Sequence, residues 1–245
     1  MRLATRTSVL AASALLLAAC SSSPDPAAPS PTIPSSSAPS PTGSSAPTTE
    51  APDPSAPAVP TDLPADVMLP GSVWEAAGDP REESEGATAW RLPDACSSEP
   101  PADAAAMRTV LQGDGAAESP IGVQQVAVFA DADAAVAAAD GLDAAIAACG
   151  ATAPDETSGG TTFVAEPLDV GAQGAGLATD HYGASQSGEL DDALGTYLAA
   201  TRRGTAVTLV ALDGGESTVG TARETVVANT QAAWDLLCRY DSAGC

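Results

Sequence analysis

A change in composition near residue 60 limits how much of this 245-residue chain can fold. Residues 21–60 contain 11 Ser, 4 Thr and 12 Pro, and they contain no aromatic residue. Such a segment cannot bury enough apolar surface to offset the entropy of ordering, so we expect a disordered tether that is open to O-glycosylation. All eight aromatic residues and four of the five cysteines lie in residues 61–245, a normal size for one domain.

The first twenty residues have the pattern of a lipoprotein leader. Arg2 and Arg6 are the only charged residues before Cys20, and a mostly apolar run over Val9–Ala19 follows them. This run is too short to remain as a membrane-spanning helix. The sequence "LAAC" that ends at Cys20 resembles a bacterial lipobox, where signal peptidase II cleaves before a cysteine that carries diacylglycerol. The alternative is an ordinary secretory signal that is cleaved after small residues.

Three segments follow from these patterns. We expect a lipoprotein signal peptide over 1–19, a lipidated Cys20 with its tether over 20–60, and a globular domain over 61–245. Stable anchoring requires two or more acyl chains, such as palmitate, on the modified cysteine. The sequence therefore predicts a protein that is held at the extracytoplasmic face of the cell membrane through Cys20.

The charge of the chain excludes several kinds of partner. The nine basic residues are all Arg and face 32 acidic residues, which gives a formal net charge of −23. A chain this acidic is repelled by phosphate backbones, so we expect no nucleic-acid partner. Attachment to anionic lipid through a basic patch is excluded for the same reason. Acidity of this kind is typical of a surface that keeps a protein soluble.

Apolar patterns predict the elements of an α+β domain. We expect strands over 87–92, 105–113, 121–129, 161–170 and 176–184, and a hairpin over 195–214 that turns at Arg203-Gly204. One helix is predicted over 132–148 after an Asp131 cap, and another over about 218–238. Hairpins dominate the β-β-β-α-β-β-β-β-α order, so we expect a single domain with a mainly antiparallel sheet packed by two main helices.

Four cysteines remain once Cys20 is assigned to lipid. An even set in an exported protein indicates two disulfides. Cys96 and Cys149 are the expected first pair, because Cys149 ends the first helix, and Cys238 and Cys245 are the expected second pair, because a short turn joins them. The alternative is a zinc site made of all four thiolates, although the chain has no C-x-x-C pair.

The residues that could do chemistry form no recognisable catalytic set. The single histidine, His181, is expected to be structural, and the Ser185 motif "GASQSG" does not match the nucleophile elbow of serine hydrolases. The glycine-rich stretch 171–176 is expected to be a flexible connection, and Asp131-Ala132-Asp133 does not match a calcium loop. We therefore expect no catalytic residue, no cofactor and no metal ligand.

Other polar and aromatic features have a structural interpretation as well. We expect Glu82-Glu83 and Asp191-Asp192 to be solvated surface charges and Arg202-Arg203 to lie in a solvated hairpin turn. The three tryptophans are expected in the core or at its edge: Trp74, Trp90 and Trp234. Paired carboxylates at a glycosidase-like site are the enzymatic alternative, but 32 acidic residues make their spacing uninformative.

Two stretches resemble the PknH-like extracellular sensor domain, a family found in actinobacterial receptor kinases and in lipoproteins with Ser/Pro-rich tethers. "VQQVAVFADADAAVAAADGLDAAIAACG" (123–150) is similar to the family's strand–helix–cysteine segment, and "DLPADVMLPGSVWEA" (62–76) is similar to its N-terminal segment. The resemblance implies an antiparallel sheet with helices and a cleft for a ligand. Family members often carry a cysteine on a late central strand, whereas here the strands over 197–212 have none, so no ligand-binding residue is carried over.

These observations predict a lipid-anchored, extracytoplasmic binding or sensor-like domain that is not an enzyme. The expected partner is a small lipid or glycan ligand. An adaptor that binds another envelope protein is the alternative, and a carboxylate-dependent hydrolase is a third hypothesis.

Overall fold

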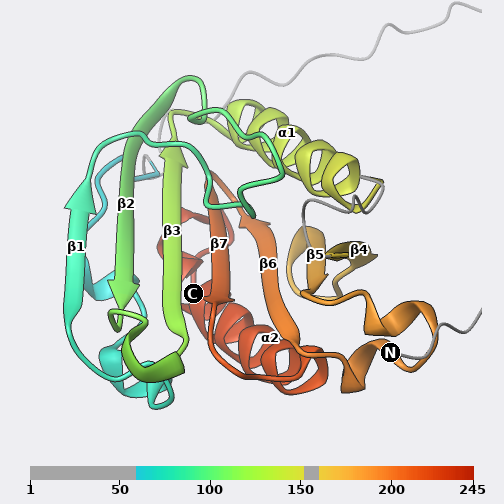
Figure 1. Cartoon of the computed structure of the whole chain (residues 1–245). Coiled ribbons are helices and arrows are strands. Elements are labelled where there is room, and N and C mark those ends of the chain that lie inside the picture. Colours follow the sequence, from blue (N-terminus) through green and yellow to red (C-terminus); the bar gives the residue numbers. More distant parts are fainter. Residues whose placement is uncertain (1–58, 152–159) are drawn as a thin grey trace, which may run out of the picture. The chain divides into compact units, whose positions relative to one another are not determined.

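A computed structural model describes residues 59–151 and 160–245 of the chain. The expected signal peptide, Cys20 and nearly all of the expected tether lie outside these residues. The described part is one α+β domain built on a seven-stranded antiparallel sheet, with the strands in the order β1-β2-β3-β7-β6-β5-β4 (Figure 1). The predicted fold class and element order are confirmed.

All seven strands are five to nine residues long. Their bounds are β1 Arg81–Glu85, β2 Ala104–Gln112, β3 Ile121–Phe129, β4 Thr162–Pro167, β5 Ala172–Asp180, β6 Gly195–Arg203 and β7 Ala206–Asp213. The two long helices are α1 Ala132–Gly150 and α2 Val219–Leu236. Short 3-10 turns occupy Ala65–Val67, Gly71–Trp74, Ala116–Glu118, Ala184–Gln186, Leu190–Asp192 and Leu237–Tyr240.

One long helix packs on each face of the sheet, which explains why the central strands are apolar on both sides. Asp131 caps α1 by accepting a hydrogen bond of 2.8 Å from the Ala134 amide, and Thr218 caps α2 in the same way. The predicted stripe of α1 is buried: Ala135, Ala139, Leu142, Ile146 and Cys149. The predicted stripe of α2 is buried too: Val219, Ala222, Val226, Thr230, Ala233 and Leu237.

The strand predicted over 87–92 is wrong. Residues 87–98, which we call the crossing segment, instead run across the α1 face of the sheet without joining it. The buried side chain of Gln125 on β3 holds this segment: its Oε1 accepts from the Arg91 amide at 2.6 Å, and its Nε2 donates to the Ala89 carbonyl at 3.1 Å. Trp90 lies between these two bonds and packs into the core beneath. An amide side chain thus takes the place of a neighbouring strand.

The first strand is β1, which contains the glutamates expected to be solvated surface charges. β1 is an edge strand, and its exposed acidic side chains are of the kind that prevent pairing with another chain. Arg108 on β2 contacts Glu83 at 3.0 Å and Glu85 at 2.5 Å across the strand pair. A hydrogen bond from Arg81 is the main reason that the pKa of Glu83 is lowered.

The glycine-rich stretch 171–176 is not a flexible connection, because β5 begins at Ala172. Two of its glycines are required by close approaches: a Cβ at Gly174 would collide with the Leu168 carbonyl, and a Cβ at Gly176 would collide with the Tyr197 hydroxyl. The glycines therefore allow close packing of the chain near the β4 edge of the sheet.

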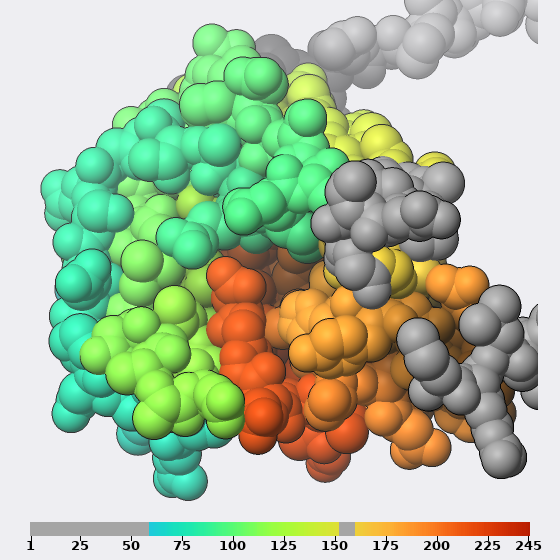
Figure 2. Space-filling model, viewed as in Figure 1, coloured from blue at the N-terminus to red at the C-terminus, as the bar shows by residue number. Residues whose placement is uncertain are grey.

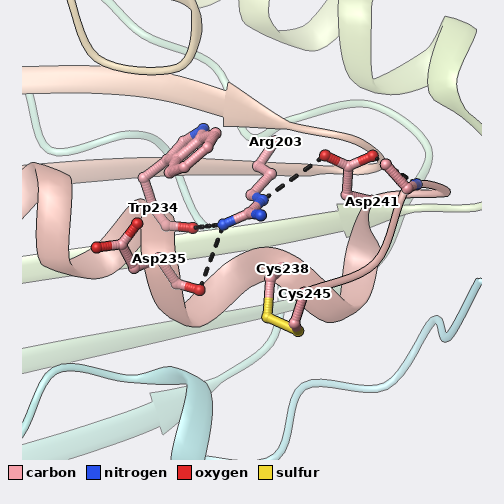
Figure 3. The surroundings of a disulfide bond; sticks show 7 residues. Arg203, Trp234, Asp235, Cys238, Asp241 and Cys245 are labelled. Carbon is pink, nitrogen blue, oxygen red and sulfur yellow. Dashed lines mark hydrogen bonds and ion pairs between the residues drawn. A yellow bond between two sulfur atoms is a disulfide. The ribbon is translucent and has the colours of Figure 1, made fainter.

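The structure joins Cys96 to Cys149 and Cys238 to Cys245, with Cα–Cα distances of 5.2 and 4.8 Å. These are the two pairs expected from the sequence. The first ties the crossing segment to the end of α1, and the second closes the C-terminal loop after α2 (Figure 3).

Arg203 is part of this C-terminal structure, so the expectation of a solvated turn is wrong for it. Its guanidinium lies 3.9 Å from the ring centroid of Trp234 and donates at 3.0 Å to the carbonyl of the same residue (Figure 3). The Asp241 carboxylate lies 3.7 Å from the Arg203 Nε. A cation in this place stabilises the unpaired carbonyls at the C-terminal end of α2. The hairpin turn itself consists of Gly204 and Thr205.

The chain enters the described domain beside its C-terminal end. Tyr240 is fully buried, and its hydroxyl donates to the Asp62 carbonyl at 2.7 Å. Leu63 and Val67 pack in the same cluster as Leu237 and Tyr240, on the α2 side of the sheet. Burial raises the pKa of Tyr240 to about 12, so the hydroxyl stays a donor at neutral pH.

We expect that Gln125→Leu releases the crossing segment. The variant keeps the shape of the side chain but leaves the Arg91 amide and Ala89 carbonyl without their partner, so the free energy of unfolding should fall by about 1–3 kcal/mol. Hydrogen exchange should show faster exchange at the Arg91 amide. Gln124→Leu is the matched control: Gln124 accepts from the Leu69 amide on the other face, so only that amide should exchange faster. Equal protection of Arg91 in wild type and Gln125→Leu would contradict the assignment.

Candidate ligand-binding cavity

A cavity of about 620 Å³ lies between the sheet and the crossing segment. It occupies the end of the α1 face that α1 itself does not cover. Its roof is residues 91–95, and its floor consists of residues from β3, β7, β6 and β5, with β4 at one side. Figure 2 shows the hollow between the green atoms of the crossing segment and the orange to red atoms of β6 and β7.

The strand register explains the chemistry of the floor. Thr179 on β5 pairs with Thr196 on β6, and extending the β6–β7 register one step beyond Tyr197 and Leu212 places Asp213 beside Thr196. We call Thr179, Thr196 and Asp213 the polar row. One step inward on the same face, Leu198, Ala211 and Val123 form an apolar row, since each pairs with the next. The cavity therefore has a polar side next to an apolar one.

The two threonine residues of the polar row are buried, and their hydroxyls are available for bonding. Thr179 and Thr196 are 6% and 8% exposed, and both line the cavity. Neither side chain has a hydrogen-bond partner among residues 59–151 and 160–245. A hydroxyl removed from bulk water is costly without a partner, and it can both donate and accept. The pair thus offers two adjacent bonding groups to whatever enters the cavity.

Charged groups of both signs lie at the mouth of the cavity. The Arg91 guanidinium lies 3.8 Å from the Asp213 carboxylate, and their side chains are 43% and 59% exposed. This distance is beyond hydrogen-bond reach, and an exposed pair of this kind contributes little to stability. Asp94 and His181 also line the cavity. Arg91 and Asp213 are therefore free to bond to a ligand at little cost to the fold.

Asp180 shapes the loop that carries His181. Its carboxylate is buried and accepts from the Ser185 amide at 2.8 Å, the Ser185 hydroxyl at 2.5 Å and the Tyr182 amide at 3.1 Å. Burial by itself would raise the pKa of Asp180, but these hydrogen bonds, led by Ser185, lower it. Asp180 therefore does not orient the His181 imidazole, and the Ser185 hydroxyl is engaged in holding the loop.

A second cluster of polar residues lies on the opposite face of the sheet. The Tyr197 hydroxyl donates to Glu166 at 2.6 Å, and Arg223 on α2 donates to the same carboxylate at 2.7 Å while contacting Asp191. Burial, with help from Glu166, raises the pKa of Tyr197 above its ordinary value. This network joins β4, β6 and α2, so we interpret it as structural. Asp191, expected to be a free surface charge, is one of its members.

A second hollow, of about 470 Å³, lies between α1 and residues 97–103. Its walls are mainly alanine and proline side chains, with Trp90 at one side. Two tryptophans expected in the core, Trp74 and Trp90, are buried, and Trp234 is half-buried under Arg203.

Within the described ranges, no group of three or more His, Cys, Asp or Glu residues could hold a metal ion. No helix in the same part of the chain has the length and apolar character needed to cross a membrane. The four thiols of the alternative zinc site are all in disulfides.

Comparisons with known proteins find similarity among solved structures. No protein-family model matches the chain, and no curated protein matches it. Among solved structures, the chain is similar to the extracellular domain of PknH from Mycobacterium tuberculosis, with a TM-score of 0.46 and 14% sequence identity. The similarity covers 69% of this chain and 93% of that chain. At these values it assigns neither a family nor a ligand.

The residues of the cavity were not singled out by the sequence. Thr179 and Thr196 are polar residues at inward-facing positions of two apolar strands, and this was the available signal. The sequence contains no signal for Arg91 and Asp213, because their proximity depends on the path of the crossing segment. Of the candidate residues considered from the sequence, only His181 lines the cavity.

We expect that Asp180→Asn destabilises the domain by about 1.5–3 kcal/mol at pH 7, because hydrogen bonds to a charged acceptor are lost. The lowered pKa means that this stabilisation is present above the unfolded pKa of about 3.9 and is lost as the pH falls through the lower folded pKa. Urea unfolding at pH 7 and near pH 3 should therefore show a difference between wild type and variant that shrinks in acid. The exposed Asp192→Asn serves as control and should differ little at either pH. A difference that stays constant from pH 7 to pH 3 would contradict this role.

Proposed function

We propose that the protein is a lipid-anchored, extracytoplasmic binding domain of the sensor-like kind, which takes up a small ligand in the cavity without chemical turnover. The observation that carries the proposal is the pair of threonines, Thr179 and Thr196, which line a roofed cavity and whose hydroxyls have no partner among the described residues. Small-molecule sites are typically concave, roughly 300–1,000 Å³, and mostly apolar with a few convergent polar groups. The cavity lies in this size range and combines a polar row with an apolar row.

The N-terminal leader and the two disulfides support the proposed location. The basic and apolar leader before Cys20 supports export and lipidation. Two disulfides support an oxidising compartment, because such bonds are rare in reducing ones.

The proposal of a non-enzymatic role is supported by the polar geometry. Ser185 and Asp180 bond to each other and not to His181, so they form no nucleophile–base set. Within the described part of the chain, the carboxyl groups with a shifted pKa are Glu83 and Asp180, and both pKa values are lowered, whereas a carboxylic acid catalyst requires a raised value.

An envelope adaptor is the second candidate. Tyr182 and Leu194 are large apolar side chains that are 70% and 44% exposed. Their loops are adjacent, since the His181 amide donates to the Leu194 carbonyl at 3.0 Å. Exposed apolar groups that lie close together are found at protein-binding surfaces.

Lipidation predicts that the N-terminal peptide of the mature protein begins at Cys20 and carries acyl chains. Mass spectrometry of that peptide should show the added mass in wild type, and Cys20→Ser should lack it. The variant should also leave the detergent phase on Triton X-114 partitioning, because stable anchoring requires the acyl chains. Ser21→Ala is the control and should remain lipidated. An unmodified Cys20 in the membrane fraction would contradict the anchor.

Ligand binding predicts that the full-length protein, purified from its own envelope, carries a small molecule detectable by native mass spectrometry. Ala211→Leu, which adds bulk to the apolar row, should lose that mass, whereas Ala144→Leu on the exposed side of α1 should keep it. Thermal unfolding verifies that both variants are folded. Recovery of a stoichiometric envelope protein and no small molecule would favour the adaptor. Turnover of an envelope substrate by the purified protein would overturn the non-enzymatic proposal.

A further inference from the structure

The geometry of the polar row points to the chemical class of the ligand. We propose that the cavity binds a neutral carbohydrate, one or two sugar rings in size, with its hydroxyls against the polar row and a ring face on the apolar row. This inference rests on the proposed function, because it names the ligand of the same cavity.

The spacing of the polar row fits a polyhydroxylated ring. Thr179, Thr196 and Asp213 lie on three adjacent strands, which are about 4.8 Å apart, so the row spans about 10 Å. Two hydroxyls that donate and accept, followed by a carboxylate that accepts, match a ligand that carries a series of hydroxyl groups. Arg91 adds donors from the roof. A sugar ring supplies donors and acceptors along its edge in this way.

The apolar row accounts for the other side of such a ligand. Leu198, Ala211 and Val123 form a flat strip beside the polar row, and Leu92 and Pro93 lie in the roof. A sugar ring has C–H groups on its faces and hydroxyls at its edge, so it can contact both sides at once. An acyl chain would cover the Thr179 and Thr196 hydroxyls and give them no partners, at a cost in binding. The 470 Å³ hollow beside α1 has a more apolar lining, with alanine and proline walls, than the 620 Å³ cavity with its polar row.

The charges around the cavity favour a neutral ligand. Among residues 59–151 and 160–245, the charged residues that line it are Arg91, Asp94 and Asp213, and His181 also lines it. A ligand anion would meet two carboxylates for one guanidinium, on a chain whose net charge is −23. A ligand cation would meet the Arg91 guanidinium in the roof. A neutral ligand uses Arg91 as a donor and Asp213 as an acceptor with no uncompensated charge.

The test uses the full-length lipoprotein in a zwitterionic detergent without sugar groups. Saturation-transfer NMR is measured with neutral mono- and disaccharides, including glucose and maltose, and with glucuronate and glucosamine as the charged counterparts of glucose. We expect saturation transfer to at least one neutral sugar, and weaker transfer to both charged sugars. Thr179→Val with Thr196→Val keeps the side-chain shape and removes both hydroxyls, so affinity for that sugar should fall about tenfold or more.

Thr225→Val is the matched control, because the Thr225 hydroxyl is exposed on α2 and bonds to the Thr221 carbonyl. It should leave affinity unchanged. Asp213→Asn, at an exposed rim position, gives a second measurement that does not disturb the core and should weaken binding severalfold. Binding that is equal in the double valine variant and in wild type overturns the site.

Saturation transfer that is stronger to glucuronate or glucosamine than to the neutral sugars overturns the neutral-carbohydrate class. Absence of transfer to every sugar of the panel overturns it as well. The proposed function then still stands if a small molecule co-purifies with wild type and is lost from Ala211→Leu. Absence of that molecule is instead the failure of the proposed function, so the two failures are distinguishable.

Discussion

The amide side chain of Gln125 sets the geometry on which the cavity depends. It is buried on the α1 face of β3 and bonds to the backbone of the crossing segment on either side of Trp90. An unpaired backbone group costs as much as a lost hydrogen bond, so this segment could not lie over an apolar sheet without such a partner. Because the amide offers both an acceptor and a donor, it imitates one step of a strand ladder. The segment therefore stays near the sheet without filling the space beside it.

The two faces of the sheet differ because of this arrangement. On the α2 face, helix and N-terminal residues fill the space with packed side chains. On the other face, α1 covers the apolar residues near one end of β5, β6 and β7, and the Cys96–Cys149 bond fixes the crossing segment to the end of that helix. The polar row lies beyond the helix, under the roof. The cavity thus exists because α1 covers only part of this face of the sheet. The crossing segment forms the roof, and the Gln125 hydrogen bonds and the Cys96–Cys149 disulfide hold it in place.

The sequence predicts those parts of the fold that depend on local patterns. The stripes of α1 and α2 repeat at helical spacing, and Asp131 precedes the first of them, so both helices could be found. The crossing segment looked like a strand because residues 87–92 are mostly apolar and include a β-branched and an aromatic residue. Its partner is a side chain 34 residues away from Arg91, which no local pattern reveals. β1 was missed for the opposite reason, since its charged residues suit an edge strand but not the pattern of a half-buried one.

The candidate site was harder to predict than the fold, because it depends on register. Thr179 and Thr196 are 17 positions apart in the chain, and they become neighbours only when β5 and β6 pair as they do. A slip of one residue in a strand would move its threonine to the other face. The pairing of Arg91 with Asp213 likewise requires the crossing segment to follow its irregular path.

The contact between Asp62 and Tyr240 has a mechanical consequence. Residues 59–63 lie on the α2 side of the sheet, where the Tyr240 hydroxyl holds Asp62 and a disulfide closes the C-terminal loop that follows. Tension along these residues would first load this contact and the small cluster around it. The cavity is on the reverse side of the sheet and shares none of these residues. The residues that would first bear tension are therefore different from those that line the cavity.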